Sequence, residues 1–187
     1  MRLTTGIYGG LHYSGKIPSN IRPTSDKTRQ SIFNVLSNLV DFDDCICLDL
    51  CSGTGALGFE ALSRGAKHLT LVDNSKKSCD IARDVANLFK IPKADYSIIC
   101  RDALKFVKDY PDDSPKFDLI FCDPPYKIDI INPLLILLGE KSMLNDDSVI
   151  TLEYAKDMKL LIPPAFRSIS HKEFGETQVE FIEIVKA

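Results

Sequence analysis

A glycine-rich turn at residues 48–58 constrains the fold of this chain more than any other segment. It reads Leu-Asp-Leu-Cys-Ser-Gly-Thr-Gly-Ala-Leu-Gly and continues the apolar run 45–48. A continuous apolar run is typical of a parallel strand buried on both faces, so helices must cover both faces of its sheet. Gly53 and Gly55 allow a sharp turn close to a ligand, and Gly58 allows the next helix to pack closely on the strand. The segment therefore predicts a strand, a tight turn and a helix that together bind a nucleoside.

Two acids indicate which nucleoside suits this turn. Asp73 ends the next apolar run, 69–72, where a carboxylate suits the hydroxyls of a ribose. Asp49 precedes the first glycine of the turn by four residues. In a dinucleotide site such as that for NAD, this acid would place a like charge near phosphates bound at the helix N-terminus. S-adenosylmethionine has no phosphate and carries two cationic groups, which a carboxylate attracts, so the sequence favours this methyl donor.

Strands and helices alternate through the rest of the chain. Apolar runs and helix start and stop signals predict four further strands, at 69–73, 96–100, 117–122 and 148–154, and helices at 56–65, 76–90, 103–108 and from Asn132 onward. The closing strands 168–174 and 178–185 are separated by so few residues that only a hairpin can join them, which makes the last strand antiparallel. We predict an α/β fold with a doubly wound, mostly parallel seven-stranded sheet, one antiparallel strand and an N-terminal hairpin arm.

The N-terminal residues carry an excess of positive charge. The chain has a net charge of -3, yet residues 1–30 hold five basic residues and one acid, a charge of +4 that leaves -7 for the remainder. This asymmetry suits contact with a polyanion, although a solvated basic face gives the same count. Residues 2–8 predict a strand, and either Thr24 or Ser25 is expected to cap the following helix. We expect a single domain, 1–187, with a substrate-facing arm at 1–24 and a catalytic core at 25–187.

The apolar runs, the cysteines and the histidines indicate where the protein is located and whether it binds metal. No apolar run approaches the roughly 20 residues of a membrane span, and the first residues contain no apolar signal segment, so we expect a cytoplasmic protein without membrane contact. The six cysteines show no C-x-x-C spacing and predict buried, reduced thiols. The three histidines are scattered without ligand spacing, so we expect no metal site.

The sequence Asp-Pro-Pro-Tyr at 123–126 follows the fourth predicted strand. The exocyclic amine of a nucleobase is a weak nucleophile because its lone pair is delocalised into the ring. Asp123 and the carbonyl of Pro124 can accept hydrogen bonds from both amine protons and so direct that lone pair at a sulfonium methyl group. Tyr126 can stack on the extruded base. An ordinary turn uses the same residue types, and Tyr126 could pack with nearby isoleucines, but the position downstream of the glycine turn favours catalysis.

Taken together, these motifs resemble those of the class I S-adenosylmethionine-dependent methyltransferases and, among them, the bacterial small-subunit (16S) ribosomal RNA guanine-N2 methyltransferases. The resemblance extends over nearly the whole chain, through segments 22–26, 33–36, 48–58, 60–66, 117–126 and 174–177. The segment Glu60-Ala-Leu-Ser-Arg-Gly-Ala66 is more discriminating than the glycine turn itself. The resemblance implies formation of one N2-methylguanosine in ribosomal RNA, within an assembled or assembling small subunit, and we expect a monomer.

These arguments assign roles to individual residues. We expect catalysis by Asp123, Pro124 and Tyr126, and substrate contacts from Lys16, Arg22, Arg29 and Tyr126. Asp73 is expected to bind the donor ribose, while Asp102 and Ala103 lie near its adenine. The complete donor-binding set is Thr24, Asp49, Cys51, Ser52, Gly53, Gly55, Asp73, Asn74, Asp102, Ala103 and Asp123.

Three alternatives stay open at this point. Arg22 can instead bind the methionine carboxylate of the donor. The Asp-Pro-Pro-Tyr motif also serves adenine or cytosine amines in duplex DNA, although a base-reading DNA enzyme needs recognition surface that this short chain scarcely provides. A catalytically silent binding module on the same fold is disfavoured because the acids and glycines of the site are all present.

Overall fold

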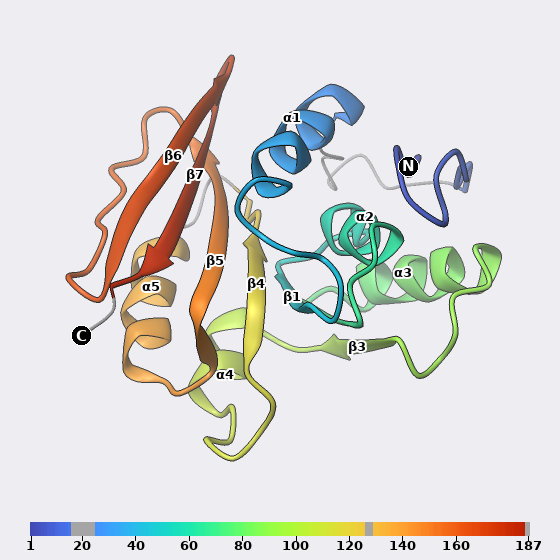
Figure 1. Cartoon of the computed structure of the whole chain (residues 1–187). Helices are drawn as coiled ribbons and strands as arrows, with labels where there is room; N and C mark the ends of the chain where they lie inside the picture. The colour runs from blue at the N-terminus through green and yellow to red at the C-terminus, as the bar shows by residue number, and fades with distance from the viewer. Residues whose placement is uncertain (16–24, 126–128, 186–187) are drawn as a thin grey trace.

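The computed structural model describes residues 1–15, 25–125 and 129–185 of the chain. One sheet organises these residues (Figure 1), and its strands are β1 (Ile46–Leu50), β2 (His68–Asp73), β3 (Tyr96–Cys100), β4 (Phe117–Cys122), β5 (Leu144–Ala155), β6 (Phe166–Phe174) and β7 (Thr177–Ile184). The strand order is β3-β2-β1-β4-β5-β7-β6. Strands β1 to β5 pair in parallel, whereas β7 is antiparallel to both of its neighbours. The predicted sheet with one antiparallel strand is confirmed.

Helices cover both faces of this sheet. They are α1 (Asp26–Leu36), α2 (Ala56–Ser63), α3 (Lys76–Leu88), α4 (Ala103–Lys108) and α5 (Ile131–Glu140). Cys47 of β1 lies in a core shared with α1, α2 and α3, while Leu48 and Leu50 lie in a second core shared with α4 and α5. Successive side chains of a strand point to opposite faces, so the continuous apolar run of β1 supplies both cores. The doubly wound arrangement is therefore also confirmed.

Short polar side chains fix where three helices begin. Ser25 caps α1 by accepting a hydrogen bond from the amide of Thr28 at 3.0 Å, which settles the choice between Thr24 and Ser25. Ser75 and Asp102 cap α3 and α4 in the same way. Each cap satisfies an amide that the first turn of a helix leaves without an internal partner. Because Ser75 and Asp102 each lie two residues after the end of a strand, β2 and β3 respectively, the caps also fix how the chain turns at this edge of the sheet.

The N-terminal residues 1–15, called the N-terminal hairpin from here on, fold back on themselves. The amide of Leu3 donates to the carbonyl of Leu11 at 3.0 Å. The regular strand predicted at residues 2–8 is wrong, because the hairpin contains only one isolated bridge, between Arg2 and His12. Gly6 and Gly10 adopt positive φ angles of 84° and 86°, which interrupt an extended strand. The rest of the predicted arm, residues 16–24, lies outside the described residues.

All six cysteines are free thiols. Four of them are buried and Cys51 is half-buried, as the sequence predicted, but Cys100 is exposed at the end of β3 and that part of the prediction is wrong. Across the described parts of the chain, none of the helices combines the length and apolar character that crossing a membrane requires.

Candidate active site at the carboxyl edge of the sheet

Parallel pairing places the ends of four strands at one edge of the sheet. Leu50 of β1 lies beside Val72 of β2 and beside Cys122 of β4. Asp73, which ends β2, lies beside Cys100, which ends β3. Ligands of open α/β sheets bind at such carboxyl edges, where the strand order also changes direction next to β1. The glycine turn and the acids expected to bind the donor therefore gather at one place.

The glycine turn contains three residues in the left-handed region, of which only the non-glycine Cys51 is strained. Cys51, Gly53 and Gly55 adopt positive φ angles of 57°, 54° and 79°. A Cβ atom on Gly55 would lie 2.7 Å from the ring of Phe59 and 3.0 Å from Leu71, so this position requires glycine. Left-handed backbone at Cys51 was not expected, because a non-glycine residue rarely adopts it. Strain of this kind is retained where the surrounding structure enforces it, which is common at ligand sites.

Asp73 ties β2 to the glycine turn. One carboxylate oxygen accepts a hydrogen bond from the amide of Gly53 at 2.8 Å, and the other accepts from the amide of Ser75 at 2.8 Å. Each oxygen has a further lone pair, so the group can still accept bonds from two hydroxyls. The amide of Arg101 also donates to the backbone carbonyl of Asp73 at 2.9 Å, which brings the loop before Asp102 to the same corner. The arrangement fits a ribose diol at Asp73.

Asp49 lies beneath the turn, between β1 and α2. Only 2% of its surface is exposed, and its carboxyl accepts a hydrogen bond from the amide of Gly58 at 2.9 Å. Burial raises the pKa of this carboxyl to about 8; the Gly58 amide opposes the rise, and the charges of Asp123 and Asp73 add to it. At neutral pH the unliganded protein therefore holds Asp49 mostly protonated. The sequence argument treated Asp49 as a charged carboxylate, whereas burial favours its protonated form, and its role in donor binding stays a prediction.

Replacing Asp49 with asparagine should change the pH dependence of stability. The pKa of the Asp49 carboxyl is about 8 in the folded protein and has its ordinary value of 3.8 in the unfolded chain. Between about pH 4 and 8 the carboxyl is therefore protonated in the folded state and ionised in the unfolded state. This group therefore makes the wild-type free energy of unfolding fall as pH rises through that window, by at most about 1.4 kcal/mol per pH unit, and level off above it. Asparagine keeps an oxygen for the Gly58 amide but cannot ionise. Urea denaturation from pH 5 to pH 9 should show wild type losing stability relative to Asp49→Asn; parallel curves would contradict the assignment.

The start of the predicted catalytic motif also lies at this edge. Asp123 directly follows β4 and is close enough to Asp49 to influence its pKa, while Pro124 is buried. The thiol of Cys51 is close enough to the thiol of Cys122 to influence its pKa, which brings the end of β4 to the glycine turn. This neighbour and the burial of Cys122 both raise the pKa of the Cys122 thiol. The contact was not anticipated, because 71 residues separate the two cysteines and neither has a motif of its own.

The structure brings together one group of the predicted site residues. This group lies at the carboxyl ends of β1, β2, β3 and β4 or in the turns that follow them, up to the first residue of α4, and contains Asp49, Cys51, Ser52, Gly53, Gly55, Asp73, Asn74, Asp102, Ala103, Asp123 and Pro124. A second group, Lys16, Arg22, Thr24 and Tyr126, lies outside the described residues. The donor-binding and catalytic roles of both groups stay predictions.

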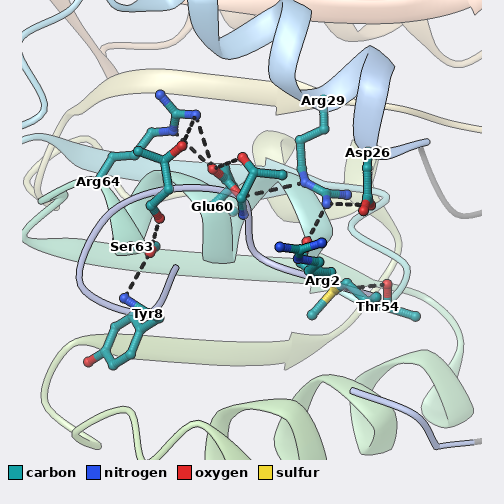
Figure 2. Close-up of polar contacts among 12 residues, drawn as sticks. Arg2, Tyr8, Asp26, Arg29, Thr54, Glu60, Ser63 and Arg64 are labelled. Atoms are coloured by element: carbon teal, nitrogen blue, oxygen red, sulfur yellow. Dashed lines mark hydrogen bonds and ion pairs between the residues drawn. The ribbon is translucent and has the colours of Figure 1, made fainter. Parts of the chain in front are cut away.

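Arg29 is the predicted substrate residue whose surroundings differ most from the expectation. It was expected to contact substrate, yet its side chain is 1% exposed. The guanidinium pairs with Asp26 at 2.8 Å and lies 3.5 Å from Glu60, and it also donates to the carbonyl of Arg2 (Figure 2). In this arrangement Arg29 joins α1 to α2 and to the N-terminal hairpin. Its contact with substrate stays a prediction.

A cavity of about 730 Å³ adjoins the glycine turn at Ala56, the first residue of α2. The N-terminal hairpin forms one wall, through Arg2 and His12, and the start of α1 forms another, through Ser25 and Asp26. A space of this volume is within the range of ligand pockets in proteins. The hairpin therefore lies beside the candidate site rather than on a remote surface.

The strand order, the glycine turn after β1, the acid that ends β2 and the Asp-Pro-Pro sequence after β4 define the class I methyltransferase fold. The chain belongs to the family described as conserved hypothetical protein 95, whose model matches residues 1–183. Among curated relatives, ribosomal RNA small subunit methyltransferase D of Haemophilus influenzae is 30% identical, with 94% of this chain and 89% of that protein covered. The putative rRNA methyltransferase YlbH of Bacillus subtilis is 34% identical, with 86% of this chain and 85% of that protein covered.

A solved structure gives the same result for the fold. The putative methylase HI0767 from Haemophilus influenzae superimposes with a TM-score of 0.81 at 28% identity, and the match covers 99% of this chain and 98% of that chain. Because this match covers 99% of this chain, it includes the N-terminal hairpin as well as the sheet.

Proposed function

We propose that this protein is an S-adenosylmethionine-dependent methyltransferase that modifies ribosomal RNA of the small subunit, at the exocyclic N2 amine of a guanine. The observation that carries the proposal is the meeting of Asp49, Asp73 and Asp123 around one glycine turn at the carboxyl edge of the sheet. The names of the relatives support ribosomal RNA as the substrate. The choice of the guanine N2 amine rests on the resemblance of the sequence motifs.

The residues of the turn fit the proposed donor. Asp73 offers acceptors for ribose hydroxyls, and the glycine turn presents backbone without Cβ atoms at Gly53 and Gly55. When bound, S-adenosylmethionine supplies an electrophilic methyl group on a sulfonium. A cation beside Asp49 favours its charged form, so donor binding should release the proton that burial holds there. The buried acid then becomes a counter-charge only while the donor is present.

Asp123 and Pro124 carry the proposed catalytic step. The carboxylate of Asp123 and the carbonyl of Pro124 accept hydrogen bonds from the two protons of the target amine. These bonds hold the nitrogen with its lone pair directed at the methyl carbon, and the developing positive charge is stabilised by Asp123. Cys122 is fully buried and anchors the start of this loop, so the position of Asp123 is set by β4. No nucleophilic side chain is needed.

A methyl-transfer assay tests the proposed function. The full-length protein is incubated with methyl-labelled S-adenosylmethionine and, in separate reactions, small ribosomal subunits, naked small-subunit RNA and duplex DNA. We expect label in ribosomal RNA, recovered as N2-methylguanosine after digestion to nucleosides and mass spectrometry. Label in DNA would identify a DNA amine methyltransferase, and no label in any substrate would identify a silent binding module.

A further inference from the structure

The second half of α2 carries polar side chains in an otherwise apolar helix. All residues of α2 are buried, and only Glu60 and Ser63 among them have polar side chains. Residues three apart lie on one face of a helix, and here that face is turned away from Asp49, to which α2 donates through Gly58. Buried polar groups need hydrogen-bond partners. Glu60 and Ser63 therefore require something polar to cover them, and the proposed chemistry uses neither.

The N-terminal hairpin supplies those partners (Figure 2). Glu60 accepts hydrogen bonds from the amide of Thr4 at 2.8 Å and from its hydroxyl at 2.6 Å. The hydroxyl of Ser63 donates to the carbonyl of Thr5 at 2.5 Å and accepts from the amide of Tyr8 at 3.0 Å. The amide of Ile7 donates to the carbonyl of Ser63 at 2.7 Å. The backbone of residues 4–8 is thus bonded to α2 instead of to a neighbouring strand.

Two arginines complete this contact. Arg64, at the end of α2, pairs with Glu60 at 3.1 Å, donates to the hydroxyl of Thr5 at 3.2 Å and lies over the ring of Phe33. Arg29 of α1 lies 3.5 Å from the other oxygen of Glu60 and donates to the carbonyl of Arg2 (Figure 2). Glu60 is fully buried, so charge-assisted bonds here are little screened by water. The carboxylate thereby holds α1, α2 and the hairpin in one arrangement.

Gly6 shows how closely the hairpin approaches α2. A Cβ atom at this position would lie 1.7 Å from the backbone carbonyl oxygen of Ser63, far inside contact distance. Gly10 has almost the same backbone, with a φ of 86° against 84°, but a Cβ atom there would meet nothing within 4 Å. The two glycines of the same hairpin therefore differ in their contact with α2 and not in φ.

We propose that the segment 60–64 fixes the N-terminal hairpin to the helix of the donor site, and that Glu60 is a positioning residue for the RNA substrate. This inference rests on the proposed function, because the hairpin places the exposed Arg2 and His12 on the wall of the cavity beside the glycine turn. Those side chains suit the phosphates of a nucleic acid. A hairpin fixed in advance loses little conformational freedom when RNA binds, which strengthens binding without a new contact. The segment 60–64, which lies in the most discriminating part of the family resemblance, thus acts on substrate affinity and not on the chemical step.

Four variants of the full-length protein test the proposal. Gly6→Ala pushes the hairpin away from Ser63. Glu60→Gln removes one of the two oxygens that accept hydrogen bonds from Thr4, and it removes the negative charge that pairs with Arg29 and Arg64. Gly10→Ala is the matched control for backbone strain. Glu180→Gln is the matched control for a buried glutamate, because Glu180 lies in β7 and bonds Tyr154 and His171 far from the hairpin.

Amide hydrogen exchange by mass spectrometry and binding to small ribosomal subunits are measured on each variant. We expect faster exchange at residues 4–8 and about 10-fold weaker binding in Gly6→Ala and Glu60→Gln, with a matching rise in KM. The affinity for S-adenosylmethionine and kcat at saturating subunits should stay close to wild type. Both controls should keep the wild-type exchange at residues 4–8. Glu180→Gln should also keep the wild-type affinity, and it is the control for affinity because Gly10 itself lines the cavity.

The outcomes separate the inference from the proposed function. Hydrogen exchange is measured on the protein without RNA. If exchange at residues 4–8 is unchanged in both test variants, segment 60–64 does not fix the hairpin. Faster exchange with unchanged subunit affinity would overturn the positioning role of Glu60. If wild type itself neither binds nor methylates small subunits, the proposed function fails, and the exchange data still decide whether segment 60–64 holds the hairpin.

Discussion

Replacing Asp123 with alanine should lower the rate of methyl transfer about 100- to 1,000-fold, by analogy with the loss of one preorganised group that stabilises transition-state charge. The bond from the target amine to this carboxylate strengthens as the nitrogen becomes positive, so the loss falls on the transition state. The affinity for S-adenosylmethionine should fall much less than the rate, because Asp123 is only one of the residues expected to bind the donor. Single-turnover methylation of small-subunit RNA measures the rate, and isothermal calorimetry measures donor binding.

Asp123→Asn should fall between alanine and wild type. Asparagine keeps an oxygen that accepts a hydrogen bond but lacks the negative charge, so part of the rate should remain. Either substitution should also lower the pKa of Asp49, because the charge of Asp123 contributes to raising it. An NMR titration of the Asp49 carboxyl measures this change in pKa, and it requires no substrate.

A control on the same loop distinguishes catalysis from a structural role. Asp129 is exposed and accepts hydrogen bonds only locally, from Asn132, among the contacts described for it. Asp129→Ala should therefore keep near-normal turnover. If Asp123 merely shaped the turn after β4, Asp123→Ala would melt at a lower temperature by circular dichroism and the folded molecules would turn over normally. Wild-type turnover in folded Asp123→Ala protein would remove the catalytic assignment.

Replacing Asp73 with alanine should weaken donor binding about 10- to 150-fold. This range corresponds to about 1.5–3 kcal/mol, the typical contribution of a hydrogen bond to a charged group. The structure adds a second reason, because Asp73 also holds the amides of Gly53 and Ser75 in place. Loss of the carboxylate therefore removes the acceptors for the ribose and loosens the turn that carries the donor. Calorimetric titration with S-adenosylmethionine measures the change.

Asparagine at position 73 should be almost as damaging as alanine. Both oxygens of Asp73 accept from backbone amides, and the amide nitrogen of asparagine is itself a donor, so one of the two backbone bonds must be lost. Asp80→Ala on α3 is the control, since it removes an exposed carboxylate that pairs with Lys76 and Arg83. An unchanged dissociation constant in Asp73→Ala would show that the donor binds elsewhere.

Elements with strong local signals were predicted with correct boundaries. Strands β3 and β4 and helix α4 match the predicted residues 96–100, 117–122 and 103–108. Their apolar runs are bounded by charged residues or prolines, and Asp102 both ends the loop after β3 and caps α4. The antiparallel direction of β7 followed from the short connection to β6, which is a property of the chain alone.

Elements whose boundaries depend on a partner were predicted less well. Strand β5 begins at Leu144, four residues before the predicted start, because Leu144 pairs with Phe117 across an irregular register. The intervening Asn145, Asp146 and Asp147 are residue types typical of turns, so the sequence indicated a loop there. At the N-terminus the sequence predicted a strand where the structure has none. The backbone there bonds to α2, which provides the hydrogen-bond partners that a neighbouring strand would otherwise supply.

The sequence by itself determined the order of the elements, the glycine turn and the acids in β1, at the end of β2 and after β4, because each depends on residues close together in the chain. Only the tertiary structure decided the burial, the protonation state and the partners of the site residues. Asp49 is mostly protonated at neutral pH because α2 excludes water from it, and Arg29 is enclosed because Glu60, 31 residues away, lies opposite it. Burial and pairing depend on contacts between distant segments, and no local pattern encodes them.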